Sequence, residues 1–267
     1  MTTAAPGLGH ALDISTTRPT PFWRLVRVEF RKSYDTRASF WLLMVIGLIV
    51  LATEAVVLAV VIANDESIQF GDFIGAAAFM TSFLLPVLGI MLVTSEWGQR
   101  TAMVTFALEP RRPMVIAAKA VVGVLLTLAT VAVAIVLGLA CNLIYGAAQG
   151  GADWTFGWAG FFAFIVNQTF AMLGGFALAA LLLNTAGAIV VFFVYKWVLP
   201  ILIGIGASLM AWFDKLAPWI DFLTAQNELY DWPLTGDQWA HLVVSGFIWL
   251  VVPLVIGIGR ILRAEVK

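Results

Sequence analysis

The sequence predicts an all-α polytopic membrane protein with six transmembrane helices. Hydrophobic residues make up 61% of the 267 residues and charged residues only 12%, about half of the roughly 25% typical of a soluble domain. Several apolar runs reach the about 20 residues that a helix needs to cross ~30 Å of hydrocarbon. Most basic residues fall in segments that would lie on one side of a membrane. These three observations argue against a soluble globular domain.

The chain begins with a polar stretch that lacks the basic and apolar parts of a signal peptide, so residues 1–19 are expected to form a disordered tail. Residues 20–38 then predict a basic amphipathic helix in the membrane interface, with its cations near anionic lipid headgroups. The apolar side chains that recur there at helical spacing are Trp23, Val26, Phe30 and Tyr34. The alternative is a charged stop that only sets the topology.

Six apolar segments are long enough to cross the membrane. They cover residues 39–62, 73–94, 118–145, 158–183, 187–210 and 239–259. The fourth and fifth are separated mainly by the turn signal LLNTAG at 182–187. Residues 211–238 are too polar to span, and their many aromatics favour an external helical segment lying on the bilayer. A ligand-capturing platform is the alternative for that segment.

The basic residues indicate the orientation. Thirteen of the 15 Lys and Arg residues lie before the first span, between the second and third, or after the sixth, where residues 260–267 form a short C-terminus. Six spans place all three regions on one side, whereas five or seven would separate them. The positive-inside rule then predicts a multi-pass protein of the plasma (inner) membrane with both termini cytoplasmic.

No motif for catalysis is present. The chain lacks a phosphate loop of the form G-x-x-x-x-G-K-[ST], an H-E-x-x-H zinc motif and a G-x-S-x-G nucleophile elbow. We therefore expect neither an enzyme nor a metal site, and no nucleic-acid partner.

Two charged residues, Glu54 and Lys196, fall inside predicted spans. A charge near the bilayer centre is costly and usually faces protein or a water-filled cavity. One hypothesis is that the two pair, or line a translocation path. The alternative is that Lys196 snorkels while Glu54 approaches the outer interface. Further path candidates are Asn142, Asn167 and Gln168, which could instead bond a neighbouring helix.

The polar segment between the second and third spans predicts a turn at Glu96–Gly98 followed by a short helix over residues 99–109, which Pro110 ends. This helix is half apolar, has charged flanks and is too short to bury its own apolar residues. It suits docking to another protein, or else it belongs to a loop that only sets topology.

The order Glu96, Gly98, Thr101, Pro110-x-Arg112, Lys119 resembles the cytoplasmic coupling loop of ABC exporter permeases of the type 2 family. One departure is that Gln99 and Arg100 separate Gly98 from Thr101, which are adjacent in many members. The resemblance covers about residues 20–265. It also fits a basic interfacial helix, six spans and a helical region between the fifth and sixth.

The resemblance implies a homodimer, or a heterodimer with a similar permease, resting on two separate ABC ATPase subunits that bind ATP and Mg. The residues expected to couple to those subunits are Glu96, Gln99, Arg100, Thr101, Val104, Arg111 and Arg112. Membrane lipids are the remaining partners. The alternatives are an ion-gradient-driven secondary transporter or channel, with Glu54 as a proton site, and a membrane scaffold.

Overall fold

A computed structural model describes residues 19–35, 37–99 and 101–264 of the chain. The regular elements of this part are all helices, and six helical units are long and apolar enough to cross a membrane. These units are Ser39–Ala63, Phe70–Gly98, Arg112–Gln149, Trp158–Leu182, Thr185–Leu209 and Gly236–Arg263. The predicted all-helical class and the number of membrane-length helices are therefore confirmed.

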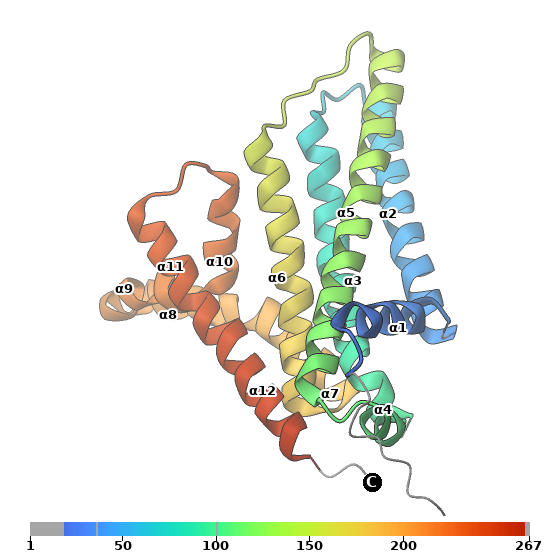
Figure 1. Ribbon diagram of the computed structural model, residues 1–267. Helices are drawn as coiled ribbons and strands as arrows, with labels where there is room; N and C mark the ends of the chain where they lie inside the picture. The colour runs from blue at the N-terminus through green and yellow to red at the C-terminus, as the bar shows by residue number, and fades with distance from the viewer. Residues whose placement is uncertain (1–18, 36, 100, 265–267) are drawn as a thin grey trace, which may run out of the picture.

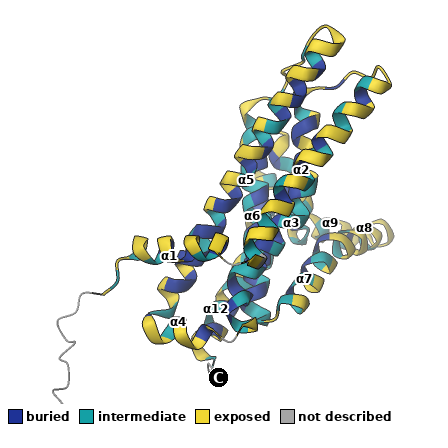
Figure 2. Cartoon of the chain, turned by 90° about the vertical axis from the view of Figure 1, so that its right-hand side faces the viewer, coloured by how far each residue is buried: buried dark blue, intermediate teal, exposed yellow. Residues whose placement is uncertain are grey.

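Four long helices lie side by side in the main bundle (Figure 1). They are α2 (Arg37–Ala63), α3 (Phe70–Gly98), α5 (Arg112–Gln149) and α6 (Trp158–Leu182). At about 1.5 Å per residue, the 38 residues of α5 reach beyond the ~30 Å of a hydrocarbon core. Much of the outer surface of these helices is exposed (Figure 2), as expected of helices that face lipid.

Helix α1 (Phe22–Asp35) lies across the bundle, and the short α4 (Ala102–Leu108) lies beyond it, near the end of the described chain (Figure 1). Helix α12 (Val252–Arg263) ends in the same region. We call this end of the molecule, which holds α1, α4, the start of α5 and the end of α12, the basic end.

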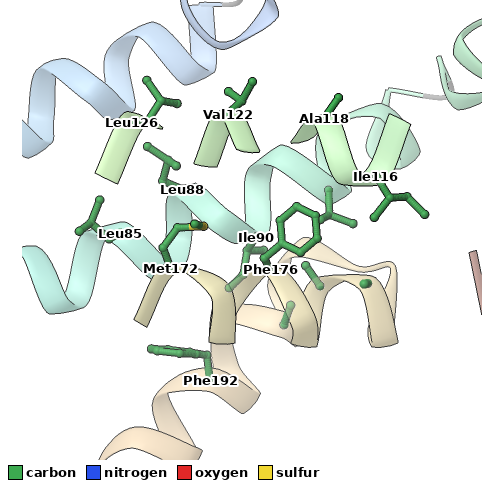
Figure 3. Close-up of a cluster of buried hydrophobic side chains, with 14 of the residues drawn as sticks. Leu85, Leu88, Ile90, Ile116, Ala118, Val122, Leu126, Met172, Phe176 and Phe192 are labelled. Atoms are coloured by element: carbon green, nitrogen blue, oxygen red, sulfur yellow. The ribbon is translucent and has the colours of Figure 1, made fainter. Parts of the chain in front are cut away.

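The core of the bundle is the contact between α3 and α6. Met172 and Phe176 of α6 lie among aliphatic side chains of α3 and α5 (Figure 3). Two glycines bring the backbones together: a Cβ atom at Gly89 would stand 2.3 Å from the carbonyl oxygen of Met172, and one at Gly175 would stand 2.3 Å from that of Pro86. Any larger residue at either position would push the two helices apart.

Helix α3 is longer than the sequence suggested. The turn predicted at Glu96–Gly98 is wrong, because α3 continues through Gly98 and the Gln99 N–H still donates to the Ser95 carbonyl at 3.0 Å. The Thr101 N–H then donates to the Glu96 carbonyl at 2.9 Å and closes the end. Helix α4 consequently starts at Ala102 and is shorter than the predicted 99–109.

The fifth and sixth units each contain one π-helical turn. Helix α7 (Thr185–Phe193) runs into η1 (Val194–Val198) and α8 (Leu199–Leu209), while α11 (Gly236–Gly246) runs into η3 (Phe247–Val251) and α12. Each π-turn ends two residues before a proline, Pro200 or Pro253. A proline has no N–H and its ring clashes with the carbonyl four residues earlier, so the helix widens in the preceding turn.

The two π-turns touch through the rings of Tyr195 and Trp249, whose centroids are 4.9 Å apart. Beyond the first of them, α8 and α9 (Ala211–Ile220) run across the direction of the long helices (Figure 1). The span predicted over 187–210 corresponds to an apolar unit of 25 residues, Thr185–Leu209, that bends at its π-turn. The predicted helical segment 211–238 contains α9, α10 (Phe222–Asn227) and η2 (Glu228–Tyr230).

Candidate functional site

Four charged side chains form a closed ring of ion pairs at the basic end. Lys119 of α5 contacts Glu29 of α1 at 2.7 Å and Glu96 of α3 at 3.3 Å. Lys32 of α1 contacts the same two carboxylates at 2.6 and 2.7 Å. Cations and anions therefore alternate around the ring, which joins three helices through side chains distant in sequence. We call these four residues the charge ring.

Three of the four members are buried, with Glu29 5%, Lys119 6% and Glu96 8% exposed. An isolated charge transferred out of water costs several kcal/mol, so these groups depend on one another. Lys32 is more accessible. Burial lowers its pKa, but the carboxylates of Glu29 and Glu96 outweigh this effect, and the net pKa is raised above the usual value for a lysine.

Helix α4 is attached to the charge ring by one hydrogen bond. The hydroxyl of Thr105 donates to the Glu96 carboxylate at 3.1 Å, and the rings of Phe106 and Trp97 lie 6.3 Å apart. A cavity of about 300 Å³ opens between α1, α3, α4 and α5. The predicted coupling residues Gln99, Thr101 and Val104 line this cavity together with the charge ring.

Helix α4 also carries exposed apolar side chains, one of which, Val104, lies at the rim of this cavity. Ala102 is buried and Thr105 and Phe106 are half-buried, whereas Met103, Val104 and Leu108 are exposed. Leu108 is 80% exposed. We call these last three residues the α4 face.

The two predicted coupling arginines hold the chain segments around α4. Arg112 donates to the carbonyls of Ile261, Leu262 and Ala264 at the end of α12, at 2.9 to 3.2 Å. Its guanidinium also lies 5.0 Å from the centroid of the Phe106 ring. Since the last carbonyls of a helix have no partner within the helix, Arg112 caps α12.

Arg111 pairs with Glu109 at 2.7 Å and donates to the Thr20 carbonyl at 2.8 Å, just before α1. The hydrogen bond from Arg111 holds the pKa of the Glu109 carboxyl below its usual value. Arg100, the remaining predicted coupling residue, lies outside the described residues, as do residues 1–18 and 265–267 of the two predicted tails.

The structure keeps the two charges of the spans apart. The carboxylate of Glu54 is fully buried, and neither oxygen has a hydrogen-bond partner among the described residues. Lys196 donates to the Ser82 carbonyl at 2.9 Å and lies 5.9 Å from the Phe83 ring. The hypothesis that Glu54 and Lys196 pair is therefore wrong, since Lys196 donates to α3 and Glu54 has no hydrogen-bond partner among the described residues.

The polar path candidates bond neighbouring segments. Asn142 donates to the Asp153 carbonyl at 3.1 Å, and Gln168 donates to the Ala78 carbonyl of α3 at 3.0 Å. The side-chain oxygens of Asn142, Asn167 and Gln168 are buried without a partner among the described residues. These residues do not converge on one site.

Sequence reasoning missed Glu29. We expected Trp23, Val26, Phe30 and Tyr34 to form the lipid-facing side of an interfacial helix. The three aromatic side chains are exposed, whereas Val26 is buried together with Glu29 and Ser33. The spacing i, i+3, i+7 of the buried set places Glu29 between two small residues that face the bundle. Glu29 also lies three residues before Lys32, a spacing that favours an ion pair.

Within the described part of the chain, no group of three or more His, Cys, Asp or Glu side chains is placed to hold a metal ion. Comparison with known proteins identified no relative: no protein-family model matches the chain, and no curated protein sequence matches it. The site therefore has to be interpreted from its own chemistry.

Proposed function

We propose that this chain is the transmembrane permease subunit of an ATP-driven ABC exporter of the type 2 family, in the plasma (inner) membrane with both termini cytoplasmic. The observation that carries the proposal is the α4 face. A helix of seven residues is too short to be stable alone, and its outward side chains are apolar although it lies outside the six apolar units. Such a surface is favourable when another protein covers it.

The charge ring supplies a physical route for coupling in this proposal. Displacing α4 would pull on the Glu96 carboxylate through Thr105, and Glu96 is bound to α1 through Lys32 and to α5 through Lys119. A buried ion-pair ring resists separation of its members. The four helices should therefore move together rather than one by one.

The partners follow from what the chain lacks. Because the sequence contains no phosphate loop, ATP and Mg would be bound by separate ATPase subunits that dock on the α4 face. A second copy of the permease, or a homologous chain, would complete the translocation path. Glu54, Lys196, Asn142, Asn167 and Gln168 remain candidates for that path.

A secondary transporter or channel driven by an ion gradient is the second candidate. It is favoured by one observation, the fully buried and unpartnered carboxylate of Glu54. Intramembrane ionisable residues commonly mark ion pathways. This candidate gives the α4 face no role.

The proposal can be tested by purifying the tagged chain gently from its native membrane. We expect an ATPase subunit to accompany it and vanadate-sensitive ATP hydrolysis to be present. Met103→Asp combined with Leu108→Asp should lower both by at least about tenfold, since each change puts a charge into an apolar contact. Trp154→Asp, an exposed aromatic in the loop between α5 and α6, is the matched control and should leave both unchanged.

Each outcome separates the candidates. Recovery of no nucleotide-binding partner would end the exporter proposal. Transport that persists in vesicles under an ion gradient, without any ATPase, would support the second candidate. A complete absence of flux with a stable complex would indicate a membrane scaffold.

A further inference from the structure

An open groove runs along α12 at the basic end, on a surface separate from the charge ring. Its volume is about 720 Å³, and it is lined by Trp97 at the end of α3, Leu183 after α6, and α12 from Ile256 to Ala264. Among the described residues that line the groove, Arg260 and Arg263 are the charged ones and none is acidic. The groove therefore combines apolar walls with two guanidinium groups.

The side chains of α12 are ordered along one stripe that leads into the groove. Val252, Val255, Ile256, Gly259, Arg260 and Arg263 are spaced at i, i+3, i+4, i+7, i+8 and i+11, which places them on one helical face. Val255 and Ile256 are exposed, as are both arginines. The stripe thus changes from apolar to basic within about one turn.

Arg260 is held in position at the point where the stripe changes from apolar to basic. Its guanidinium donates to the Leu181 carbonyl at 2.5 Å, in the last turn of α6. An arginine carries five N–H donors, so most of its donors are left for an anion. The Gly259 position is open, because a Cβ atom built there would meet nothing within 4 Å, and it leaves room beside both arginines.

We propose that this groove binds an anionic phospholipid. The phosphate lies between Arg260 and Arg263, and an acyl chain extends along Val252, Val255 and Ile256. Along the stripe the apolar side chains come first and the arginines follow, which is the same order as the acyl chain and the headgroup of a lipid. Basic pockets between membrane helices recognise such headgroups. A soluble anion would use the arginines but would leave the apolar half of the stripe without a function.

A ligand bound in the groove would also affect α4. Trp97 lines the groove and lies against Phe106 of α4, which in turn supports the Arg112 guanidinium. A bound lipid would therefore stabilise the side of α4 that faces the bundle. The inference does not depend on the proposed exporter function, because it concerns binding to the chain alone.

Native mass spectrometry of the purified protein, with phosphatidylglycerol or phosphatidylcholine added, tests the proposal. We expect phosphatidylglycerol to be retained in preference to phosphatidylcholine. The Arg260→Gln, Arg263→Gln double variant should bind phosphatidylglycerol about 25-fold more weakly, at roughly fivefold per arginine. Gly259→Leu keeps both charges and fills the groove, and should weaken retention as well. The control is Lys215→Gln, which removes one positive charge from an exposed position on α9 and is compared with Arg260→Gln alone; it should leave retention unchanged.

Three results would overturn the proposal. The first is equal retention of both lipids by the unaltered protein. The second is a loss in Lys215→Gln equal to that in Arg260→Gln, which would mean that only the total charge matters. The third is displacement of the lipid by glycerol 3-phosphate at similar concentration, which would identify a soluble-anion site. The thermal unfolding temperature of each variant, measured without added lipid, shows whether a loss of binding reflects a loss of folding. If the double variant unfolds, the lipid retention of Gly259→Leu tests the proposal in its place.

Discussion

Glu96 and Glu54 are both buried carboxylates on long apolar helices, but their surroundings differ. Glu96 contacts Lys32, Lys119 and the Thr105 hydroxyl, whereas neither oxygen of Glu54 has a partner among the described residues. Glu96 lies where α1, α3, α4 and α5 converge. Glu54 lies in the second half of α2, between Val50 and Val57, which belong to hydrophobic clusters. The first arrangement uses buried charge to hold helices together, and the second keeps a polar group where packing alone would favour an apolar one.

The largest effect is expected from Lys119→Met, which removes the most buried cation of the charge ring. Glu29 and Glu96 would then share only the partly exposed Lys32, and a buried ion pair that loses one partner typically costs about 3–5 kcal/mol. We expect the thermal unfolding temperature in detergent to fall clearly. Lys32→Met is the comparison variant and should cost less, because the Lys32 side chain is 38% exposed. An equal fall in unfolding temperature in Lys119→Met and Lys32→Met would show that burial does not decide how much each lysine stabilises the charge ring.

Replacing Glu54 is expected to change the unfolding temperature in the opposite direction. Replacing it with leucine removes a buried polar group without a partner, whose desolvation costs about 1–3 kcal/mol, and keeps a similar volume. We expect Glu54→Leu to leave the unfolding temperature unchanged or raise it, while Glu96→Leu lowers it. If Glu54→Leu also abolishes transport, the carboxylate serves the path. A marked loss of stability would instead reveal a partner for Glu54 that the described residues do not provide.

A smaller effect is expected where α4 meets the charge ring. Thr105→Val removes the hydroxyl that donates to Glu96 but keeps the shape of the side chain, and a hydrogen bond to a charged group contributes about 1.5–3 kcal/mol. The charge ring itself should survive, so hydrogen exchange should rise in α4 and remain slow in α3. Thr105→Ser retains the hydroxyl and is the control. Uniform exchange across both helices would contradict a local attachment.

The smallest effect is a dependence on pH. The hydrogen bond from Arg111 lowers the pKa of Glu109, so the stabilisation from this pair is complete above the usual carboxyl pKa of 4.5. It is lost as the pH falls through the lowered pKa of the folded state. We expect the unfolding temperature to decline at acidic pH by slightly less in Glu109→Gln than in the unaltered chain. Identical profiles would show that the pair does not contribute.

The sequence predicted the coarse features of the candidate site better than its contacts. Glu96, Gln99, Thr101 and Val104 were named in advance and line one cavity. Glu29 was overlooked, because a single acidic residue in a basic amphipathic helix looks like a solvated side chain. Its partner Lys119 lies 90 residues away, and no local spacing relates the two. The hypothesis that Glu54 and Lys196 pair failed for the same reason, since their positions within two predicted spans do not say which helix faces meet.

The sequence by itself determined the helices. Long apolar runs must satisfy their backbone hydrogen bonds internally in lipid, and this requirement is local, so the six membrane-length units could be read directly. Pro200 and Pro253 likewise mark the π-turns from within their own segments. Only the tertiary structure decided that α8 turns across the bundle, that Glu29 of α1 faces the bundle, and that four charges close into one ring. These outcomes depend on how helices pack against one another, and a buried charge is stable only where that packing supplies its partner.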